Sequence, residues 1–466
     1  MNKKVFYSAW VIFFAILAIV GGVGVKFYEE RSAMLGKIEK LQSRLAARDH
    51  LVPEDKNLPA SAGLLAAAAL QSVVSKKEEL KNNGTPFVFV DLRAMQVELY
   101  DSNGTSTTLP VLTKGREGSW WETPTGDYSV VGKEQNHFSS IGKVWMPWSI
   151  QFYGNFFIHG WPYYEDGEPV AQTYSGGCIR LSIDDAKLVY DFVKKGTPIL
   201  IREDGIPNEA LPPLVSNNYR PVPGLTASSV LVADVFGGDV LLDKSGDRSL
   251  PMASLAKLMT GVVASELIYL ERSITITPAM LSAKIQSFPF KSGDNYSAFD
   301  LLYPMLMESS NGAASAIASF IGEASFVKAM NTKAKSLGMK DTVFADPAGI
   351  LDGNVATARD LSTLMAYILD KRYFLLDITK GKNYLQFGPS HFSDIKNFNE
   401  FAGEESLIGM KNGETTDAKQ TILSLWKLKD SNNAERDIVI VVLGSDDRAK
   451  DTEALLNWVK ASFGLD

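Results

Sequence analysis

The stretch SGGCIRLS (175–182) contains Cys178, the only cysteine among 466 residues. Two glycines precede it, and glycine permits a tight turn that leaves the next side chain accessible. A cysteine becomes a nucleophile when a base takes its proton, and histidine is the usual base. His159 precedes Cys178 by 19 residues, at the end of the apolar run IQFYGNFFI, so a strand end and a loop can bring the two together. The pair predicts thiol chemistry, with His137 as the next candidate base; the plainer alternative is a buried thiol and a core histidine.

A second pair of reactive residues lies in PMASLAKLMTG, where Ser254 and Lys257 are three positions apart at the start of a helical pattern. This spacing places both side chains on one helix face, one turn apart. A buried lysine whose pKa is lowered can take the proton of a serine, and N–H groups at a helix start favour developing negative charge. Ser-x-x-Lys alone is common on helix surfaces. Here two further motifs follow in order, Ser309-Ser310-Asn311 and Lys411-Asn412-Gly413, and the set predicts a serine acyl-transfer site.

The overall composition narrows the classes of function. A hydrophobic fraction of 45% and a charged fraction of 22% are typical of globular chains. The formal net charge of −7 argues against a nucleic-acid partner. The four histidines and one cysteine form no clustered zinc-ligand pattern, so we expect no metal and no cofactor.

The N-terminal residues differ most from the average composition of the chain. Residues 5–25, VFYSAWVIFFAILAIVGGVGV, contain no charge and are long enough to cross a bilayer as a helix. We interpret residues 1–26 as an uncleaved membrane anchor with a short cytoplasmic tail, and a cleaved signal peptide is the alternative. The rest of the chain is then exported, so its single cysteine has no intramolecular disulfide partner.

Beyond the anchor, changes in pattern divide the chain. Residues 27–85 favour a helical stalk, and 86–203 show short β-rich runs with one helix at IDDAKLVYDFVKK. Residues 204–223 are rich in proline and predict a linker. Residues 224–466 alternate helical periods with strands such as SVLVADV and DIVIVVLG. We therefore expect a multidomain protein with an N-terminal transmembrane helix, a mainly-β domain and a mixed α/β (α+β) domain.

Residues 86–203 resemble the L,D-transpeptidase (YkuD-type) catalytic domain, a family of peptidoglycan cross-linking enzymes. The resemblance lies in ETPTGDYSV, FFIHG and SGGCIRLS. It implies that Cys178 attacks a donor tetrapeptide stem, with His159 as base and a thiolate that forms below the free-cysteine pKa of about 8.5. It also implies that Arg180 faces the substrate and that N–H groups around Gly177 and Cys178 hold the oxyanion.

Residues 224–466 resemble the D-alanyl-D-alanine carboxypeptidase family of penicillin-recognising serine enzymes, also through FADPAGILDGNVATARDLSTLMAYIL. The resemblance implies that Ser254 is acylated, Lys257 is its general base and Ser309 relays a proton. The remaining implied contacts are Asn311 with the substrate amide, Lys411 with negative charge, Asn412 and Gly413 with the substrate end, and Glu414, whose N–H completes an oxyanion hole with that of Ser254.

The chain departs from the two families at Gly176, where a histidine is usual, and at Asn412, where a threonine is usual. Asn412 can still donate a hydrogen bond, so we expect altered affinity with activity retained. A protein in which one half has decayed into a peptidoglycan-binding module is one alternative. A D,D-endopeptidase or a β-lactamase is the alternative for the second half, although the acidic loop pattern of class A β-lactamases is missing.

Together these observations predict a bifunctional cell-wall enzyme. The serine site would trim D-alanine from pentapeptide stems, and the cysteine site would cross-link the resulting tetrapeptides. The expected partners are peptidoglycan stem peptides, β-lactams as covalent inhibitors, and a membrane bound through the N-terminal helix. The expected location is the extracytoplasmic side of a bacterial cell membrane, with a single pass.

Overall fold

The computed structural model describes residues 76–466 apart from 172–173, 204–212, 217, 219, 236, 282–289, 384–390 and 393–394. The described residues all belong to one compact unit. The predicted anchor, most of the predicted stalk and the first part of the predicted linker lie outside them. Within the described part of the chain, none of the helices is long and apolar enough to cross a membrane.

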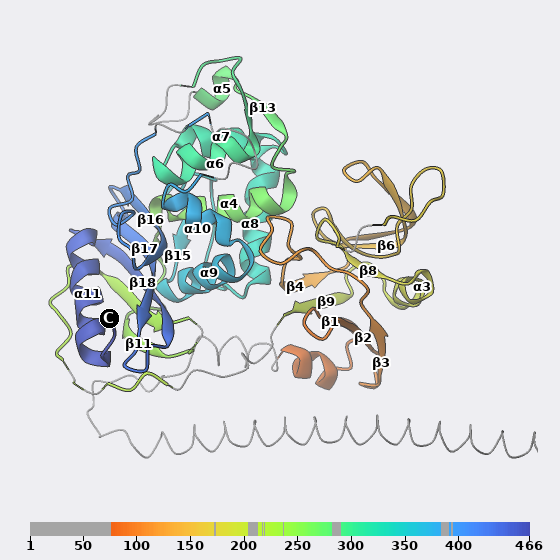
Figure 1. Cartoon of the computed structure of the whole chain (residues 1–466), viewed down its shortest axis with the longest axis horizontal. Helices are drawn as coiled ribbons and strands as arrows, with labels where there is room; N and C mark the ends of the chain where they lie inside the picture. Colours follow the sequence, from red (N-terminus) through yellow and green to blue (C-terminus); the bar gives the residue numbers. More distant parts are fainter. Residues whose placement is uncertain are drawn as a thin grey trace, which may run out of the picture. The chain divides into compact units, whose positions relative to one another are not determined.

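The first domain consists of two sheets and one long helix (Figure 1). The five-stranded sheet has the order β3-β2-β1-β9-β4, and the four-stranded sheet has the order β5-β6-β7-β8. The strands of the larger sheet are β1 (Phe87–Asp91), β2 (Gln96–Tyr100), β3 (Ser106–Pro110), β4 (Gly126–Ser129) and β9 (Pro198–Arg202). Those of the smaller sheet are β5 (Gly132–Ser139), β6 (Val144–Tyr153), β7 (Phe156–Gly160) and β8 (Ile179–Leu181), with α3 (Ile183–Phe192) packed on β6, β7 and β8.

Alternation along the strands builds the core of this domain. On β1, Val88 and Val90 point into the main cluster, which also contains Ile158 from β7 and Ile179 from β8. Successive side chains of a strand point to opposite faces. Phe87 and Phe89 therefore pack on the outer face, against Leu80 of a helical segment at 76–82. The core fixes β7 and β8, which carry the predicted thiol site.

The second domain is built on a five-stranded antiparallel sheet of order β11-β10-β18-β17-β16. Alternate residues of β18 divide between two cores: Val439 and Val441 face one cluster, and Ile438 and Ile440 face the other. The second cluster lies under α11, and the first lies under the remaining helices (Figure 1). The strands are β10 (Ser229–Asp234), β11 (Val240–Lys244), β16 (Leu407–Thr415), β17 (Lys419–Lys429) and β18 (Glu435–Ser445), and the helix is α11 (Arg448–Phe463).

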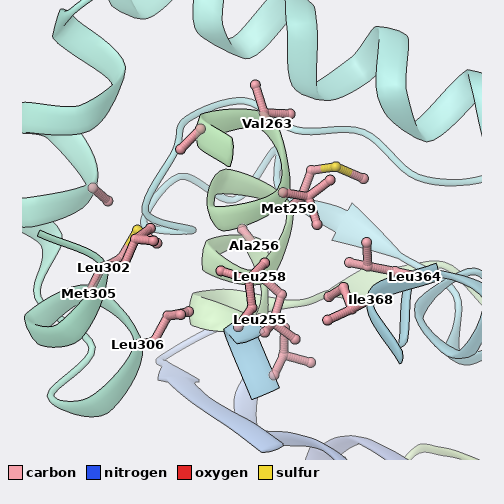
Figure 2. Close-up of a cluster of buried hydrophobic side chains, with 14 of the residues drawn as sticks. Leu255, Ala256, Leu258, Met259, Val263, Leu302, Met305, Leu306, Leu364 and Ile368 are labelled. Atoms are coloured by element: carbon pink, nitrogen blue, oxygen red, sulfur yellow. The ribbon is translucent and has the colours of Figure 1, made fainter. Parts of the chain in front are cut away.

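The helical side of this domain centres on α4 (Ala256–Leu267), which is buried along nearly its whole length. Figure 2 shows α4 between Leu302 and Leu306 on one side and Leu364 and Ile368 on the other. A helix that is apolar all round belongs in a core, and this burial holds the start of α4 in place. The other elements are η1 (Ala253–Leu255), α5 (Pro278–Leu281), α6 (Ala298–Met307), α7 (Asn311–Ser319), α8 (Glu323–Ser336), α9 (Ala358–Lys371), α10 (Tyr373–Thr379), and the short strands β12 (Leu250–Pro251), β13 (Ser273–Thr275), β14 (Asn295–Ser297) and β15 (Val355–Ala356).

Candidate active sites

The serine site lies where η1 continues into α4. Ser254 is in η1, and Nζ of Lys257, one turn on, donates to its Oγ at 2.8 Å. The same Nζ donates to Oδ1 of Asn311 at 2.8 Å and to the carbonyl of Ala348 at 2.6 Å. Three segments that are distant in sequence, around Ser254, Asn311 and Ala348, therefore meet at one lysine nitrogen. The structure brings together Ser254, Lys257 and Asn311, as the sequence predicted.

The surroundings of Lys257 favour its neutral form. The side chain is fully buried, and burial, with the nearby charge of Lys411, lowers its pKa well below the usual value. In the neutral form Nζ keeps two N–H groups, which serve Asn311 and Ala348, and its lone pair can accept the hydroxyl proton of Ser254. The geometry can therefore generate a serine nucleophile without any further base.

A loop organised by Asp346 completes the surroundings of Lys257. The Asp346 carboxylate accepts backbone N–H groups from Ala348 at 2.7 Å, Gly349 at 2.7 Å and Leu351 at 2.7 Å, and the amide of Asn354 at 2.6 Å. This cage aims the carbonyl of Ala348 at Lys257. Asp346 carries no signal in the sequence, because most of its partners are backbone N–H groups, which leave no motif of side chains.

Ser309 lies in the turn directly before α7, where Ser310 is the N-cap and accepts the N–H of Ala313 at 3.2 Å. Ser309 has a φ of 60°, a left-handed conformation that non-glycine residues rarely adopt. Such strain persists where surrounding structure enforces it and is concentrated at functional turns. Its predicted role as a proton relay stays a prediction.

Strand β16 runs beside the nucleophile. A Cβ built on Gly413 would lie 2.7 Å from the backbone nitrogen of Ser254 and 2.9 Å from Cβ of Ala253. Glycine is therefore required for the close approach of the strand to the Ser254 N–H. Thr421 on β17 supports the same turn by donating to the carbonyl of Met252 at 3.1 Å. The predicted oxyanion donors, the N–H groups of Ser254 and Glu414, lie on these two adjoining segments.

The other predicted residues of β16 are already engaged within the protein. Nζ of Lys411 donates to the backbone carbonyl and to Oδ1 of Asn412, both at 2.9 Å. Nδ2 of Asn412 donates to the carbonyl of Phe398 at 2.7 Å and to Glu400 at 2.8 Å. Both N–H groups of the Asn412 amide are therefore hydrogen-bonded to protein acceptors. From the sequence, one of them was expected to bind the substrate. The side chain of Glu414 is exposed and pairs with Arg448 at 3.3 Å.

The thiol site is formed by β7 and β8, which pair in parallel with His159 opposite Arg180. Cys178 directly precedes β8, so it lies on the same face as His159 and diagonal to it. Sγ of Cys178 donates to the carbonyl of Asn155 at 3.7 Å, a weak contact. In this arrangement the thiol and the imidazole are neighbours that share no hydrogen bond.

His159 is almost completely buried, with 1% of its surface exposed. Its Nδ1 lies 2.6 Å from the carbonyl of Gly160, which requires a proton on Nδ1 and leaves the lone pair on Nε2. Burial lowers the pKa of His159 to about 4, and burial raises the pKa of the Cys178 thiol to about 11. The structure therefore favours a neutral thiol and a neutral base, opposite to the preformed thiolate that the sequence analysis expected.

The two glycines before Cys178 differ in whether their position could accommodate a side chain. Gly177 has a φ of 103°, and a Cβ there would overlap the ring of Phe156 and lie 2.8 Å from the carbonyl of Trp121. Gly176 has no such constraint, since a Cβ there would meet nothing within 4 Å. The N–H of Gly177, a predicted oxyanion donor, instead donates to Oγ of Ser175 at 3.0 Å. The position where the family carries histidine is therefore sterically open.

Arg180 is largely buried beside the thiol. Its Nη1 donates to the carbonyl of Tyr174 at 3.2 Å, and its guanidinium lies 5.7 Å from the ring centre of Trp161. Its backbone bonds to the 112–113 segment join β8 to the rest of the domain. These contacts tie Arg180 to the rest of its domain, and its predicted contact with substrate stays a prediction. Among the described residues, His, Cys, Asp and Glu form no group of three or more that could hold a metal ion.

Comparison with known families finds a match for each of the two domains. Residues 85–201 match the family model of the L,D-transpeptidase catalytic domain, and residues 217–447 match that of the D-alanyl-D-alanine carboxypeptidase. The chain therefore joins a domain of the L,D-transpeptidase family to a domain of the D-alanyl-D-alanine carboxypeptidase family. Both resemblances noted in the sequence are confirmed, as is the two-domain architecture.

Among the similar proteins are D-alanyl-D-alanine endopeptidases and carboxypeptidases. A D-alanyl-D-alanine endopeptidase of Pseudomonas aeruginosa is 38% identical over 156 residues, covering 33% of this chain and 50% of the relative. The D-alanyl-D-alanine carboxypeptidase DacC of Escherichia coli is 26% identical over 259 residues, covering 51% of this chain and 62% of the relative. Penicillin-binding protein D2 of Listeria monocytogenes, solved in a cefotaxime-bound form, has a TM-score of 0.44 and 26% identity, covering 51% of this chain and 99% of that one. The chain thus spans about half to two thirds of the length of these curated relatives.

Proposed function

We propose that this chain is a bifunctional cell-wall enzyme, held at the outer face of a bacterial membrane by its N-terminal segment. Its serine site removes the terminal D-alanine from peptidoglycan pentapeptide stems. Its cysteine site joins the resulting tetrapeptides to neighbouring stems. The observation that carries the proposal is the 2.8 Å contact between Nζ of the fully buried Lys257 and Oγ of Ser254. The first domain of the same chain carries the thiol of Cys178.

At the serine site, Oγ of Ser254 attacks the carbonyl carbon of the penultimate D-alanine while its proton moves to neutral Lys257. The N–H groups of Ser254 and Glu414 hold the oxyanion. The C–N bond to the terminal D-alanine then breaks, and that amine leaves with the proton. Water hydrolyses the remaining ester and releases a tetrapeptide.

At the cysteine site, Sγ of Cys178 attacks the carbonyl carbon that precedes the D-alanine of a tetrapeptide. Because the resting thiol is neutral, its proton transfers to Nε2 of His159 as the C–S bond forms. His159 then returns the proton to the departing D-alanine. An amine of a neighbouring stem attacks the thioester and forms the cross-link, which frees the thiol.

A D,D-endopeptidase activity is the second candidate for the serine site. The similar proteins of Pseudomonas aeruginosa and Escherichia coli at 38% and 35% identity are both D-alanyl-D-alanine endopeptidases. Cleaving a D,D cross-link uses the same attack on the same type of bond. Purified protein supplied with D,D-cross-linked dimers or with pentapeptide monomers distinguishes the two: the carboxypeptidase releases D-alanine, and the endopeptidase converts dimers to monomers.

Intact mass spectrometry after exposure to β-lactams tests the proposal. A penicillin should add one mass increment, lost in Ser254→Ala. A carbapenem should add two, of which one is lost in Ser254→Ala and the other in Cys178→Ala. A wild-type protein that takes only the Ser254 adduct would favour a decayed first domain that binds peptidoglycan without cross-linking it.

A further inference from the structure

Two segments flank Cys178 in the first domain, and both are held by side chains or backbone of the second. One is the loop 119–123, and the other is the β6–β7 turn at Gly154 and Asn155. Neither segment carries a residue with an assigned chemical role. Their contacts nevertheless reach the peptide group and the sulfur of Cys178.

The loop 119–123 is anchored by buried charge. Nζ of Lys371, at the end of α9, lies 2.8 Å from the carboxylate of Glu122, and both side chains are at least 96% buried. Nη2 of Arg372 donates to the backbone carbonyl of Glu122 at 3.2 Å. Lys371 also pairs with Glu203 of the first domain. Removing one partner of a buried ion pair leaves an uncompensated charge, so these contacts hold the loop against the second domain.

The next residue of this loop fixes the peptide group before the nucleophile. Oγ1 of Thr123 donates to the carbonyl of Gly177 at 3.0 Å and accepts the N–H of Gly115 at 2.8 Å. The carbonyl of Gly177 and the N–H of Cys178 belong to one planar trans peptide, so they point in opposite directions. By holding the carbonyl, Thr123 sets the direction of the Cys178 N–H, which is the predicted oxyanion donor.

The β6–β7 turn reaches the sulfur from the other side. Nδ2 of Asn155 donates to the carbonyl of Leu267 at 3.0 Å, and the backbone carbonyl of the same Asn155 accepts Sγ of Cys178. Gly154 packs so closely that a Cβ there would overlap the side chain of Leu267. Leu267 is the last residue of α4, whose first turn contains Lys257. One buried helix therefore begins at the serine site and ends against the turn that contacts the thiol.

We infer that the carboxypeptidase domain positions the cysteine site: Lys371 through Glu122 and Thr123 orients the Cys178 N–H, and Leu267 through Asn155 places the sulfur. Lys371 and Asn155 are thus positioning residues for transpeptidation and make no contact with the reacting atoms. The inference rests on the proposed role of Cys178 as nucleophile. It departs from a simple tether, in which the linker alone keeps two independent enzymes near each other.

The test uses the full chain with Lys371→Met and Asn155→Ala. The matched control is Lys427→Met, which removes the exposed ion pair with Glu435 at 2.8 Å in the same domain. Three rates are followed by intact mass: Cys178 acylation by a carbapenem, Cys178 alkylation by iodoacetamide, and Ser254 acylation by a penicillin. Of these three rates, only the first depends on an oxyanion donor at the cysteine site.

We expect both positioning variants to slow carbapenem acylation of Cys178 by about ten- to a hundredfold, because small displacements of a reacting group cost that much. Iodoacetamide alkylation and Ser254 acylation should stay within about twofold, as expected for groups whose access and local structure are unchanged. Lys371→Arg should restore the carbapenem rate, and Lys427→Met should change none of the three.

The inference would be overturned if both variants were acylated by the carbapenem at the wild-type rate. It would also be overturned if iodoacetamide alkylation of Cys178 slowed or accelerated as much as carbapenem acylation, because that result would indicate a general loosening of the first domain. If Lys371→Met loses Ser254 acylation through misfolding, Asn155→Ala decides the result. Failure of the proposed function gives a different result from failure of the inference alone. If Cys178 is not the nucleophile, the wild-type protein forms no Cys178 adduct with the carbapenem, and the inference fails with it.

Discussion

Lys257 and Lys411 are both fully buried at the serine site, and the charge of Lys411 lowers the pKa of Lys257. Lys257 must be neutral to accept the proton of Ser254, whereas Lys411 stabilises negative charge only when protonated. Burial lowers the pKa of Lys411 itself to about 7. The active form therefore requires a neutral Lys257 beside a protonated Lys411.

This pairing predicts an alkaline limit to serine chemistry. As the pH rises through about 7, Lys411 loses its proton, so kcat/KM for release of D-alanine should fall about tenfold per unit well above that value. A guanidinium stays charged throughout this range. Lys411→Arg should therefore lose the alkaline limb, whatever its absolute rate. An alkaline limb unchanged in Lys411→Arg would show that another group causes it.

The contact between Gly413 and the nucleophile turn predicts the effect of one methyl group. In Gly413→Ala the new Cβ would lie 2.7 Å from the nitrogen of Ser254, so the strand or the turn must shift. Loss of one oxyanion donor typically slows acyl transfer by about 10²- to 10³-fold. We expect penicillin acylation of Ser254 to slow by that factor. Acylation at the wild-type rate would mean that the strand accommodates the methyl group and that the N–H of Ser254 is not the oxyanion donor.

The two glycines before Cys178 offer a matched pair of substitutions. Gly177→Ala places a methyl group against Phe156 and requires a φ of 103°, so we expect a large loss of stability and of Cys178 reactivity. Gly176→Ala enters open space and should leave both within experimental error. Thermal unfolding and carbapenem labelling measure the two effects. Equal behaviour of the two variants would contradict the backbone geometry described for this turn.

The raised pKa of Cys178 predicts how the thiol reacts with pH. Thiolate forms as the pH rises toward the pKa of about 11, so iodoacetamide alkylation should increase about tenfold per unit from pH 7 to 9 without a plateau. A plateau below pH 8.5 would instead indicate a thiolate held by protonated His159.

To test the role of His159, the substitution must keep this buried position filled and hydrogen-bonded. His159→Ala would leave a cavity at this buried position. His159→Asn keeps a donor for the carbonyl of Gly160 and removes the base. We expect it to abolish cross-linking while leaving the alkylation profile unchanged. Retained cross-linking in a folded His159→Asn protein would move the base to another group.

The two reactive pairs could be located from sequence because their motifs are local. Ser254 and Lys257 are one helical turn apart. Cys178 directly precedes β8, which pairs with the strand that carries His159, so residue type and spacing carry the information. The contact between Glu122 and Lys371 joins residues 249 positions apart and leaves no such pattern. Glu122 and Lys371 are common charged residues, and they become buried only where the two domains pack together.

The pKa directions at the thiol site were also beyond sequence reasoning. A cysteine next to glycines resembles an exposed, activated thiol, yet the fold buries His159 and sets the thiol against the carbonyl of Asn155. Desolvation is a property of the assembled core, and it disfavours the charged form of both groups. The same reasoning applies to Asn412, whose amide is taken by Phe398 and Glu400, two residues outside the motif.

The central claim is that the product of Ser254 is the substrate of Cys178, and pentapeptide substrate alone tests it most directly. Purified full-length protein is incubated with pentapeptide muropeptides, and tetrapeptides and L,D cross-links are followed by liquid chromatography and mass spectrometry. The account predicts cross-links with the wild-type protein, accumulated tetrapeptide with Cys178→Ala, and no cross-links with Ser254→Ala until tetrapeptide is added. Cross-linking of pentapeptides by Ser254→Ala at the wild-type rate would contradict it.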